Sequence, residues 1–490
     1  MAESPGGLQS RVTAANGAAV APGAAFVLYW MTSFRRAGWN HSLDRAVSWA
    51  QQLGRPLLVL EALRSDYPWA SDRIHQFILR GMADNEAALR RTRVKYYPYV
   101  EDSPGAGKGL LSALARHACV VITDDFPAFF VPRMVAKAAQ QLPVLLERVD
   151  SNGLIPFRLA AKEFTRAHHF RRFLHNQLAD YLGDLPNPRA LKGKRLPQCG
   201  SLPAEIVDRW PPTDLRTLLK DGDGVGGLPL DHSVPPVELS GGSAAARRIL
   251  LRFVDERLAR YAEFRNHPEA GVTSGLSPYL HFGHISTFEI VKTLLDYQDW
   301  SPDRIEPAAA GQRRGWWGID ENAEAFLDEL VTWRELGFNT CSQSRDFESY
   351  RSLPEWARRT LDGHRHDLRT HVYTPDQFER GETHDRLWNA AQHQLVREGS
   401  IHGYLRMLWG KKILEWSPDP ETAHSIMVEL NNKYALDGRD PNSHSGISWV
   451  LGKYDRPWAP ERAIFGTVRY MSSQNTARKF KINSYLERYG

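Results

Sequence analysis

Short apolar runs alternate with helically spaced apolar residues in the first third of the chain. The runs that predict buried strands lie at 25–31, 56–63, 94–100, 118–126 and 143–149. The segments that predict helices lie at 41–53, 72–91, 108–117 and 132–141. This alternation favours an α/β domain built on a Rossmann-like, doubly wound parallel sheet, in which ligands bind at the carboxyl ends of the strands.

The second half has a different pattern. From residue 244 to residue 490 the apolar spacing is helical almost throughout, which predicts an all-α domain. A stretch rich in Pro and Gly, from about 183 to 242, has little periodicity and is typical of a linker. We expect four parts: a disordered tail at 1–24, the α/β domain at 25–158, a helical and irregular linker at 159–243, and the helical domain at 244–490.

Composition limits the number of domains, the kinds of partner and the cellular compartments that fit the protein. The 490 residues suffice for two or more domains with full cores, and the formal charge of +5 permits a polyanionic partner without requiring one. The three cysteines, Cys119, Cys199 and Cys341, are too few and too far apart for a disulfide framework or a Cys-based zinc site. No apolar run reaches the roughly 18 residues of a membrane span. We expect a cytoplasmic protein with no membrane segment and no metal.

No G-x-G-x-x-G motif follows a predicted strand, which disfavours a nicotinamide-binding or ATP-binding Rossmann domain. Polar chemistry is concentrated in the helical half. In GVTSGLSPYLHFGHIS (271–286), Thr273, Ser274 and Ser277 are residue types that begin helices, and free backbone N–H groups at a helix start suit a phosphate. An ordinary capping box is the alternative.

A second polar segment, LNNKYALDGRDPNSHSGISW (430–449), places two carboxylates and several amides between apolar helices. Charged groups are seldom buried unless they are paired, so this loop is expected to hold something polar. A solvated turn is the alternative, because Asp-Gly and Asp-Pro are ordinary turn formers. In FLDELVTWRELGFN (326–339), Glu329 and Trp333 are four residues apart and would share one face of an α-helix.

The order of residues in these segments resembles that of one protein family. DGRDPN, then SGISW, then W-x-x-E-R-x-x-F-G-x-V-R-Y-M resemble the C-terminal signature of class II cyclobutane pyrimidine dimer photolyases, in the photolyase/cryptochrome family. GVTSGLSPYLHFGHIS resembles the loop of that family that binds the FAD diphosphate, and WMTSFRRAGWNHSLDRA (30–46) resembles its N-terminal domain. The resemblance is weak over residues 26–180 and strong over 245–480.

This resemblance implies a light-driven DNA-repair enzyme, a carbon–carbon lyase. An electron passes from photoexcited, reduced anionic FAD to a flipped-out cyclobutane pyrimidine dimer, the ring opens, and the electron returns. The α/β domain would be of the antenna type; the residues neither require nor exclude a second chromophore of the deazaflavin type. The partner would be UV-damaged DNA. We expect a monomer without an obligate protein partner, associated with the nucleoid if the source is prokaryotic.

The resemblance also implies roles for individual residues. Asn431 would lie near the flavin N5, and Asp437 would pair with Arg334. The residues expected to bind the flavin are Tyr261, Thr273, Ser274, Gly275, Leu276, Ser277, Arg334, Asn431, Asp437 and Asp440.

On the substrate side, Glu329 would hydrogen-bond the damaged base, and Trp333 and Trp449 would sandwich the dimer. Trp409 (proximal), Trp388 (distal) and, further out, Tyr373 would carry electrons from the surface to the flavin. The residues expected to contact DNA are Arg265, Asn266, Glu329, Trp333, Met407, Trp449 and Arg469; those expected to act in catalysis are Glu329, Asn431, Trp409 and Trp388.

Two other functions stay open. One is a cryptochrome-like flavin photoreceptor without repair activity, and the other is a photolyase for (6-4) photoproducts. The joint presence of Glu329, Trp333 and Trp449 favours repair over light sensing. No His pair stands at an obvious motif position for (6-4) chemistry, although His444 keeps that alternative open.

Overall fold

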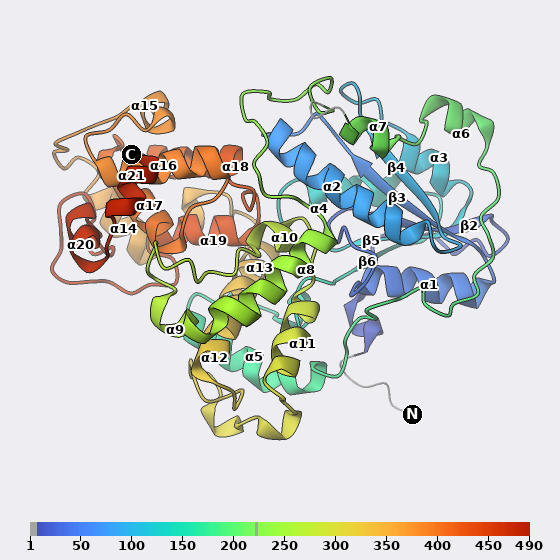
Figure 1. Ribbon diagram of the computed structural model, residues 1–490, viewed down its shortest axis with the longest axis horizontal. Coiled ribbons are helices and arrows are strands. Elements are labelled where there is room, and N and C mark those ends of the chain that lie inside the picture. Colours follow the sequence, from blue (N-terminus) through green and yellow to red (C-terminus); the bar gives the residue numbers. More distant parts are fainter. Residues whose placement is uncertain (1–6, 221–223) are drawn as a thin grey trace. The chain divides into compact units, whose positions relative to one another are not determined.

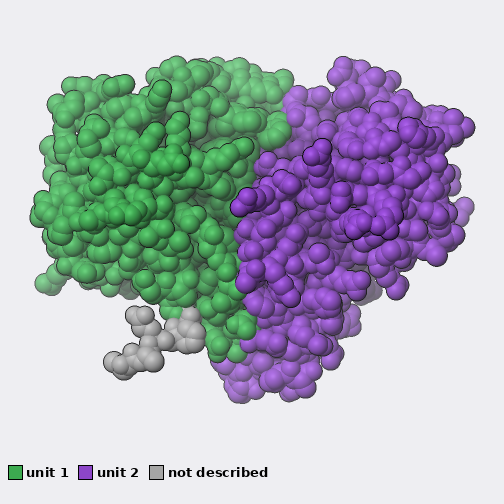
Figure 2. Space-filling model, turned by 180° about the vertical axis from the view of Figure 1, so that it is seen from behind, with its two compact units in different colours: residues 1–159, 177–251, 275–299 green, residues 160–176, 252–274, 300–490 purple. Residues whose placement is uncertain are grey.

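The computed structural model describes residues 7–220 and 224–490, so the first six residues of the expected tail and residues 221–223 of the expected linker lie outside the described residues. The chain divides into two compact units, coloured separately in Figure 2. Unit 1 comprises residues 1–159, 177–251 and 275–299. Unit 2 comprises residues 160–176, 252–274 and 300–490.

Unit 1 contains a six-stranded sheet in the order β1-β6-β5-β2-β3-β4 (Figure 1). The strands are β1 Val12–Ala14, β2 Phe26–Met31, β3 Leu57–Leu63, β4 Lys95–Val100, β5 Ala118–Asp124 and β6 Leu146–Val149. All neighbours are parallel except β1, which runs antiparallel to β6. The chain moves from β2 to β3 and β4, then returns to β5 and β6 on the other side of β2. The predicted doubly wound sheet and its five strands are confirmed.

The expected disorder of residues 1–24 is wrong for residues 8–14. Leu8–Arg11 forms a short 3-10 helix, η1, and β1 follows it directly. The Arg11 guanidinium is buried and donates hydrogen bonds to the carbonyl oxygens of Gly153 (3.2 Å) and Leu154 (2.6 Å). An Ala/Gly-rich composition carries no periodicity that would reveal this order, which comes from hydrogen bonds to a distant segment.

Helix α1 (His41–Leu53) illustrates how the sequence builds the α/β core. The Asn40 side chain caps it by accepting hydrogen bonds from the N–H groups of Ser42 and Leu43. Its apolar face packs against β2, β5 and β6. The other helices mainly in unit 1 are α2 Asp72–Leu89, α3 Leu110–Ala115, α4 Val131–Gln141, α6 Ala204–Arg209, α7 Leu215–Lys220, α8 Ser243–Arg252, α10 Ser277–His281 and α11 Thr287–Tyr297.

The carboxyl edge of this sheet is occupied by an internal carboxylate. After β2 the chain continues to β3 on one side, and after β5 it continues to β6 on the other side. Asp124 ends β5 and is fully buried. Its Oδ2 accepts hydrogen bonds from the backbone N–H groups of Thr32 (2.9 Å), Ser33 (2.7 Å) and Phe34 (2.9 Å). Backbone N–H groups at such a switch point bind the phosphates of nucleotides in Rossmann domains. Asp124 therefore accepts hydrogen bonds from the backbone N–H groups that a nucleotide phosphate would need.

Unit 2 is helical, as predicted, and most of its later helices appear in orange and red in Figure 1. Its helices are α5 Ala167–Tyr181 (shared with unit 1), α9 Tyr261–Phe264, α12 Glu321–Leu327, α13 Arg334–Gln343, α14 Glu355–Gly363, α15 Pro375–Arg380, α16 Arg386–Glu398, α17 Gly403–Trp416, α18 Pro420–Tyr434, α19 Pro441–Val450, α20 Ser473–Lys479 and α21 Asn483–Tyr489. Two π-helical segments are η3 Phe253–Arg257 and η7 Asp328–Trp333. The remaining short 3-10 helices are η2 Phe157–Leu159, η4 Leu258–Arg260, η5 Pro302–Arg304, η6 Pro307–Ala309 and η8 Tyr350–Ser352.

Helix α17 lies centrally in unit 2, in contact with α16, α18 and α19. Helix α16 ends before it at Gly399, whose φ of 66° favours glycine. At Gly410 a Cβ atom would meet Val450 Cγ2 at 2.7 Å, so glycine permits the close approach of α17 and α19. Over residues 7–220 and 224–490, no helix has the length and apolar character that a bilayer span requires.

Candidate functional site

A π-helical turn carries the predicted acid and one predicted aromatic wall. Glu329 and Trp333 both lie in η7, between α12 and α13, instead of on the regular α-helix that their spacing suggested. Hydrogen bonds in a π turn run to the fifth residue, and such turns occur often at functional sites. The α-helical face expected from a spacing of four residues is therefore corrected: a local widening of the helix presents these two side chains.

Glu329 forms an ion pair with Arg265, whose Nη1 donates to Glu329 Oε1. The two side chains are 42% and 27% exposed, so the pair remains open to solvent and to a ligand. Desolvation raises the pKa of Glu329, and the positive charge of Arg265 opposes that rise. Arg265 also lies against the ring of Tyr261, 6.0 Å from its centroid. Two residues expected to contact DNA and one expected to bind the flavin thus adjoin one another.

Trp333 and Trp449 are brought together directly. Their rings stack with centroids 4.5 Å apart and planes 10° apart. A base inserted between two rings needs roughly 7 Å, about two contacts of 3.5 Å. In this structure the two rings contact each other, so they would have to separate before a dimer could lie between them. Both indoles are half-buried, and the guanidinium of Arg469 lies 5.8 Å from the Trp449 ring.

The expected pairing of Asp437 with Arg334 is wrong. Asp437 accepts hydrogen bonds from Nη2 of Arg406, at 3.0 Å to Oδ1 and 3.4 Å to Oδ2. Arg406 lies in the first turn of α17 and reaches the loop that follows α18. Arg334 is buried at the start of α13, where its guanidinium lies 4.4 Å from the Phe338 ring, one turn further along the helix. The sequence signal that could have indicated Arg406 is its position as a lone arginine near the start of an apolar helix.

The polar loop between α18 and α19 is organised by Arg439. This residue is 2% exposed, has a φ of 65°, and donates through Nη2 to the carbonyl oxygens of Ala435 (3.1 Å) and Leu436 (3.2 Å). Its backbone N–H donates to Oδ1 of Asn432 at 2.8 Å. The structure places Asp440 at the N-cap of α19, where Oδ1 accepts from the N–H of Asn442 at 2.9 Å. Arg439 and Asp440 thus shape the loop, and sequence reasoning missed the role of Arg439.

Asn431 is the other buried amide of this region. It lies in the last turn of α18 and is 2% exposed. Its Nδ2 donates to Oδ1 of Asn432 at 3.3 Å, a long bond that leaves donor and acceptor capacity for a ligand. Buried amide groups normally satisfy that capacity.

Trp388 and Trp409 are linked by hydrogen bonds inside unit 2. The Trp388 indole N–H donates to the carbonyl oxygen of Trp409 at 3.0 Å, and the Trp409 indole N–H donates to Oε1 of Gln392 at 2.9 Å. Both indoles are buried, at 0% and 2% exposure. The predicted proximal and distal tryptophans are therefore neighbours, and Gln392, which the sequence did not single out, holds one of them.

Aromatic contacts continue outward from Trp388. Its ring lies 6.0 Å from that of Trp416, and the Trp416 ring lies 5.7 Å from that of Tyr373. Phe378 packs beside this row, 5.3 Å from Trp388 and 5.8 Å from Tyr373. The structure thus places Trp416, to which the sequence analysis assigned no role, between the predicted distal tryptophan and Tyr373.

The expected phosphate loop falls in two parts. Thr273 and Ser274 end a segment of unit 2, where the Thr273 carbonyl accepts a hydrogen bond from Arg257 at 3.2 Å. Gly275, Leu276 and Ser277 belong to unit 1. Helix α10 begins at Ser277, and its N-cap is Leu276, whose side chain makes no capping hydrogen bond, instead of one of the predicted capping residues. Gly275 has a φ of 71°, a conformation that favours glycine.

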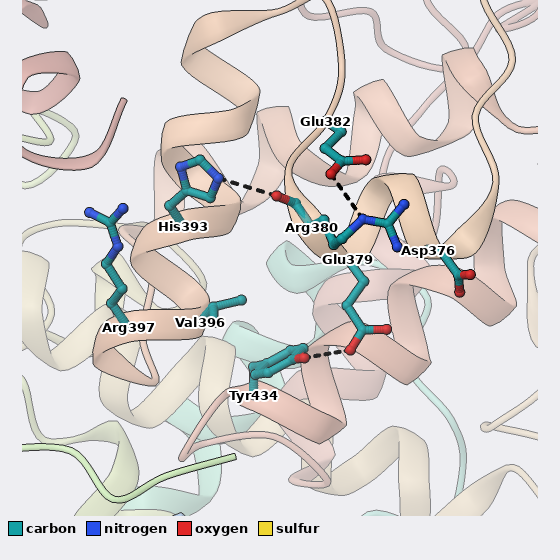
Figure 3. Close-up of a pocket in the computed structure, with 8 residues that line it drawn as sticks. All are labelled: Asp376, Glu379, Arg380, Glu382, His393, Val396, Arg397 and Tyr434. Carbon is teal, nitrogen blue, oxygen red and sulfur yellow. Dashed lines mark hydrogen bonds and ion pairs between the residues drawn. The ribbon is translucent and has the colours of Figure 1, made fainter. Parts of the chain in front are cut away.

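Two predicted residues make no contact with other described residues that assigns them a role. Asn266 is exposed beyond α9, and Met407 is half-buried on α17 beside Arg406. A pocket of about 580 Å³ also lies in unit 2, and none of the residues that line it is a predicted site residue (Figure 3). It is lined by Asp376, Glu379, Arg380, Glu382, His393, Val396, Arg397 and Tyr434. Several of its charges are paired, Arg380 with Glu382 at 2.9 Å and Glu379 with Lys433 at 2.7 Å.

Known proteins resemble this chain over nearly its whole length. A deoxyribodipyrimidine photo-lyase of Methanothermobacter thermautotrophicus is 34% identical over 464 residues, 94% of each chain. Deoxyribodipyrimidine photo-lyases of Arabidopsis thaliana and Potorous tridactylus are 31% and 32% identical over 94% of this chain and 88% and 80% of their own.

A search of family models finds no match. Among solved structures, a class III photolyase from Agrobacterium tumefaciens shares the fold, with a TM-score of 0.64 and 17% identity over 95% of this chain and 86% of its own. Identity above 30% across nearly the full length of several relatives shows common descent, and the fold agrees with it. The chain therefore belongs to the photolyase/cryptochrome family, as a relative of its deoxyribodipyrimidine photo-lyases.

Proposed function

We propose that this protein is a light-dependent DNA-repair lyase that uses FAD to split cyclobutane pyrimidine dimers. The observation that carries the proposal is the 34% identity that spans 94% of both chains with a protein named deoxyribodipyrimidine photo-lyase. The adjoining Glu329–Arg265 pair and the Trp333–Trp449 stack support it, because an acid beside aromatic surface suits a damaged base.

The donor set in unit 2 fits a flavin. Nε of Arg406 is buried and has no hydrogen-bond partner, and Asn431 keeps unused amide capacity. These groups would face the polar edge of the ring, with Asp437 fixing Arg406 in place. FAD, when bound in its reduced anionic form, supplies the excited electron. The residues hold the ring, supply hydrogen bonds that favour negative charge on it, and exclude water.

The lesion would be received by side chains that already contact each other. Flipping a base costs a few kcal/mol, least at a damaged site, and stacking on an aromatic ring returns about 1–3 kcal/mol per base. We propose that the dimer displaces the Trp333–Trp449 contact or stacks on its outer face. Glu329 would then lie beside the charge that develops on the base, and in its protonated form it would donate a hydrogen bond there.

The cyclobutane dimer is favoured over the (6-4) photoproduct as substrate. A (6-4) photolyase needs a histidine that donates a proton at the lesion, and His444 is the candidate nearest the motif. His444 is buried beside Phe347, and desolvation lowers its pKa to about 4, so it is neutral near pH 7. We infer cyclobutane specificity, of the class II type that the motifs indicate.

The test is a repair assay with the purified protein carrying chemically reduced FAD. Oligonucleotides with a single cyclobutane thymine dimer, and matched ones with a single (6-4) photoproduct, are incubated in blue light and in darkness. Light-dependent loss of the cyclobutane dimer alone is expected. Loss of the (6-4) product alone would overturn the substrate, and loss of neither with flavin bound would favour the light-sensor function.

We also propose that the enzyme acts as a monomer in a reducing compartment, the cytoplasm. The three cysteines are free, and Cys119 and Cys341 are buried. Light scattering of the purified protein, alone and with dimer-containing DNA, tests the monomer: one protein per DNA site is expected.

A further inference from the structure

Tyr373 and His384 form a doubly hydrogen-bonded pair in unit 2. The Tyr373 hydroxyl and Nδ1 of His384 are 2.7 Å apart. The backbone N–H of His384 donates to the same phenolic oxygen at 3.0 Å. The phenolic oxygen is therefore held from both sides by one residue, eleven positions along the chain.

The pair lies at the outer end of the row of aromatic rings. Trp388, Trp409 and Trp416 are buried, whereas Tyr373 is half-buried and His384 is exposed. The Tyr373 backbone N–H also donates to the Trp416 carbonyl at 3.1 Å, which fixes the phenol beside the last indole. The row of rings thus meets solvent at Tyr373.

A phenol can supply an electron near neutral pH only if its proton has a place to go, because the oxidised phenol is a strong acid. General bases act on a proton within hydrogen-bond reach, about 2.6–3.2 Å. His384 meets this distance, with Nδ1 2.7 Å from the phenolic oxygen. Partial desolvation and the neighbouring His371 lower its pKa, which favours the neutral ring that can accept a proton.

The direction of the bond follows from the available partners. If Nδ1 carried the hydrogen, the phenolic oxygen would accept two N–H bonds. The phenolic hydrogen would then have no protein acceptor among the described residues, since its only hydrogen-bond contacts there are to His384. All three groups are satisfied if the phenolic O–H donates to an unprotonated Nδ1 and the phenolic oxygen accepts from the His384 backbone N–H.

We propose that Tyr373 and His384 end the electron path as a proton-coupled donor, with His384 as the base. The inference rests on the proposed function, in which the protein binds FAD. Light-excited, oxidised FAD would be the oxidant, and it would draw an electron along Trp409, Trp388 and Trp416 and leave an indole radical cation at Trp416. Tyr373 gives one electron to Trp416 and its phenolic proton to Nδ1 of His384. The products are a neutral Trp416, a neutral tyrosyl radical and an imidazolium. A thiolate from solvent then gives one electron to the tyrosyl radical and becomes a thiyl radical, and the proton returns from Nδ1 of the imidazolium to the phenolic oxygen.

The experiment is flash illumination of the protein loaded with oxidised FAD, followed by electron paramagnetic resonance. The wild type is expected to give a tyrosyl radical that Tyr373→Phe abolishes. His384→Asn keeps an acceptor oxygen near the place of Nδ1 but cannot hold the proton. In this variant tyrosyl formation is expected to slow by about a hundredfold, as for loss of a general base, and the radical stays on tryptophan.

The matched control is His393→Asn. The ring nitrogens of His393 bond the carbonyl oxygens of Tyr489 (2.8 Å) and Arg380 (3.3 Å), and it makes no hydrogen bond to Tyr373 among the described contacts. This variant is expected to form the tyrosyl radical at the wild-type rate. Formation should also be slower in deuterated water in the wild type and not in His384→Asn.

Two outcomes would overturn the inference. One is a wild-type yield and rate of the tyrosyl radical in His384→Asn. The other is nitrogen NMR, recorded in darkness, that finds the hydrogen of His384 on Nδ1 instead of Nε2. A wild type that shows no light-induced radical at all would remove the electron path of the proposed function as well, whereas the repair assay with reduced protein tests repair separately.

Discussion

The indole rings of Trp333 and Trp449 stack face to face, at 4.5 Å between centroids and 10° between planes, although 115 residues separate them in the chain. Trp333 projects from the π turn before α13, and Trp449 projects from the end of α19. Helices α13 and α19 pack against each other, which brings the rings into contact. Without DNA, the Trp333 and Trp449 rings thus cover each other's aromatic faces, on which a bound lesion would stack.

Replacing Trp449 with alanine is expected to weaken binding of dimer-containing DNA more than binding of undamaged DNA. The expected loss is about 1–3 kcal/mol for the lesion, the worth of one base stacked on one ring. Binding is measured by fluorescence anisotropy with the two DNAs at the same salt concentration. The control is Trp458→Ala, at a ring that is 40% exposed and lies beside Arg456. Equal losses for both DNAs would assign Trp449 to packing alone.

Replacing Glu329 with alanine is expected to lower the repair yield several-fold while the protein keeps its flavin. Glu329 lies in the same π-helical turn as Trp333, and its carboxyl is the donor that would meet charge on the damaged base. Yield is measured as dimers split per absorbed photon with reduced protein. Glu321→Gln, in the preceding helix α12 and paired with Arg314, is the control. An unchanged yield would contradict the role of Glu329.

The Arg406–Asp437 pair is expected to hold the flavin. Arg406→Met leaves the Asp437 carboxylate without its cation, and an unsatisfied partly buried charge costs about 1–3 kcal/mol. FAD content after purification and the FAD dissociation constant are the measurements. FAD content should fall and the FAD dissociation constant should rise in Arg406→Met and in Asp437→Asn. The double variant should bind FAD only slightly more weakly than either single variant. Additive losses would mean that the two residues act separately.

Replacing Trp409 with phenylalanine is expected to block photoreduction of oxidised FAD and to spare repair by protein that is reduced beforehand. Phenylalanine keeps the ring and is a poor electron donor. Absorbance spectra under blue light follow photoreduction, and the dimer assay follows repair. Trp300→Phe, at an indole bonded to the Trp317 carbonyl at 2.6 Å in a different part of unit 2, is the control. Survival of photoreduction in Trp409→Phe would show that electrons take another path.

Lys411 gives a prediction about pH. This residue is 1% exposed, and its ammonium donates to the Val450 carbonyl at the end of α19. Desolvation lowers the pKa of Lys411 from 10.5 to about 7. Between these values the unfolded chain binds a proton that the folded protein has lost, so this lysine makes stability rise with pH over that window. Below pH 7 its burial costs the full penalty, on the order of 3–5 kcal/mol.

Lys411→Met should therefore gain in free energy of unfolding relative to the wild type below pH 7, and the gain should shrink as pH rises toward 10. Urea unfolding at several pH values measures it. Lys412→Met, which removes the neighbouring ammonium that is bonded to Glu415 at 2.6 Å, is the control. A gain that does not vary with pH would contradict the depressed pKa of Lys411.

The sequence by itself determined the elements and the family. Strands β2 to β6, helix α1 with its Asn40 cap, and the break at Gly399 follow from periodicity and capping, which act within a few residues. The DGRDPN and GLSPYLHFG motifs indicated the photolyase family before any fold was known, because a site keeps its residue types in order along the chain.

Tertiary structure alone decided which of these residues meet. It ordered β1 against β6, widened the helix at Glu329, and gave Asp437 the partner Arg406 instead of Arg334. It also stacked Trp333 on Trp449 and bonded Tyr373 to His384. Local patterns report only which face of an element is apolar. The pairing of side chains from separate elements depends on how those elements pack, and no local pattern records that.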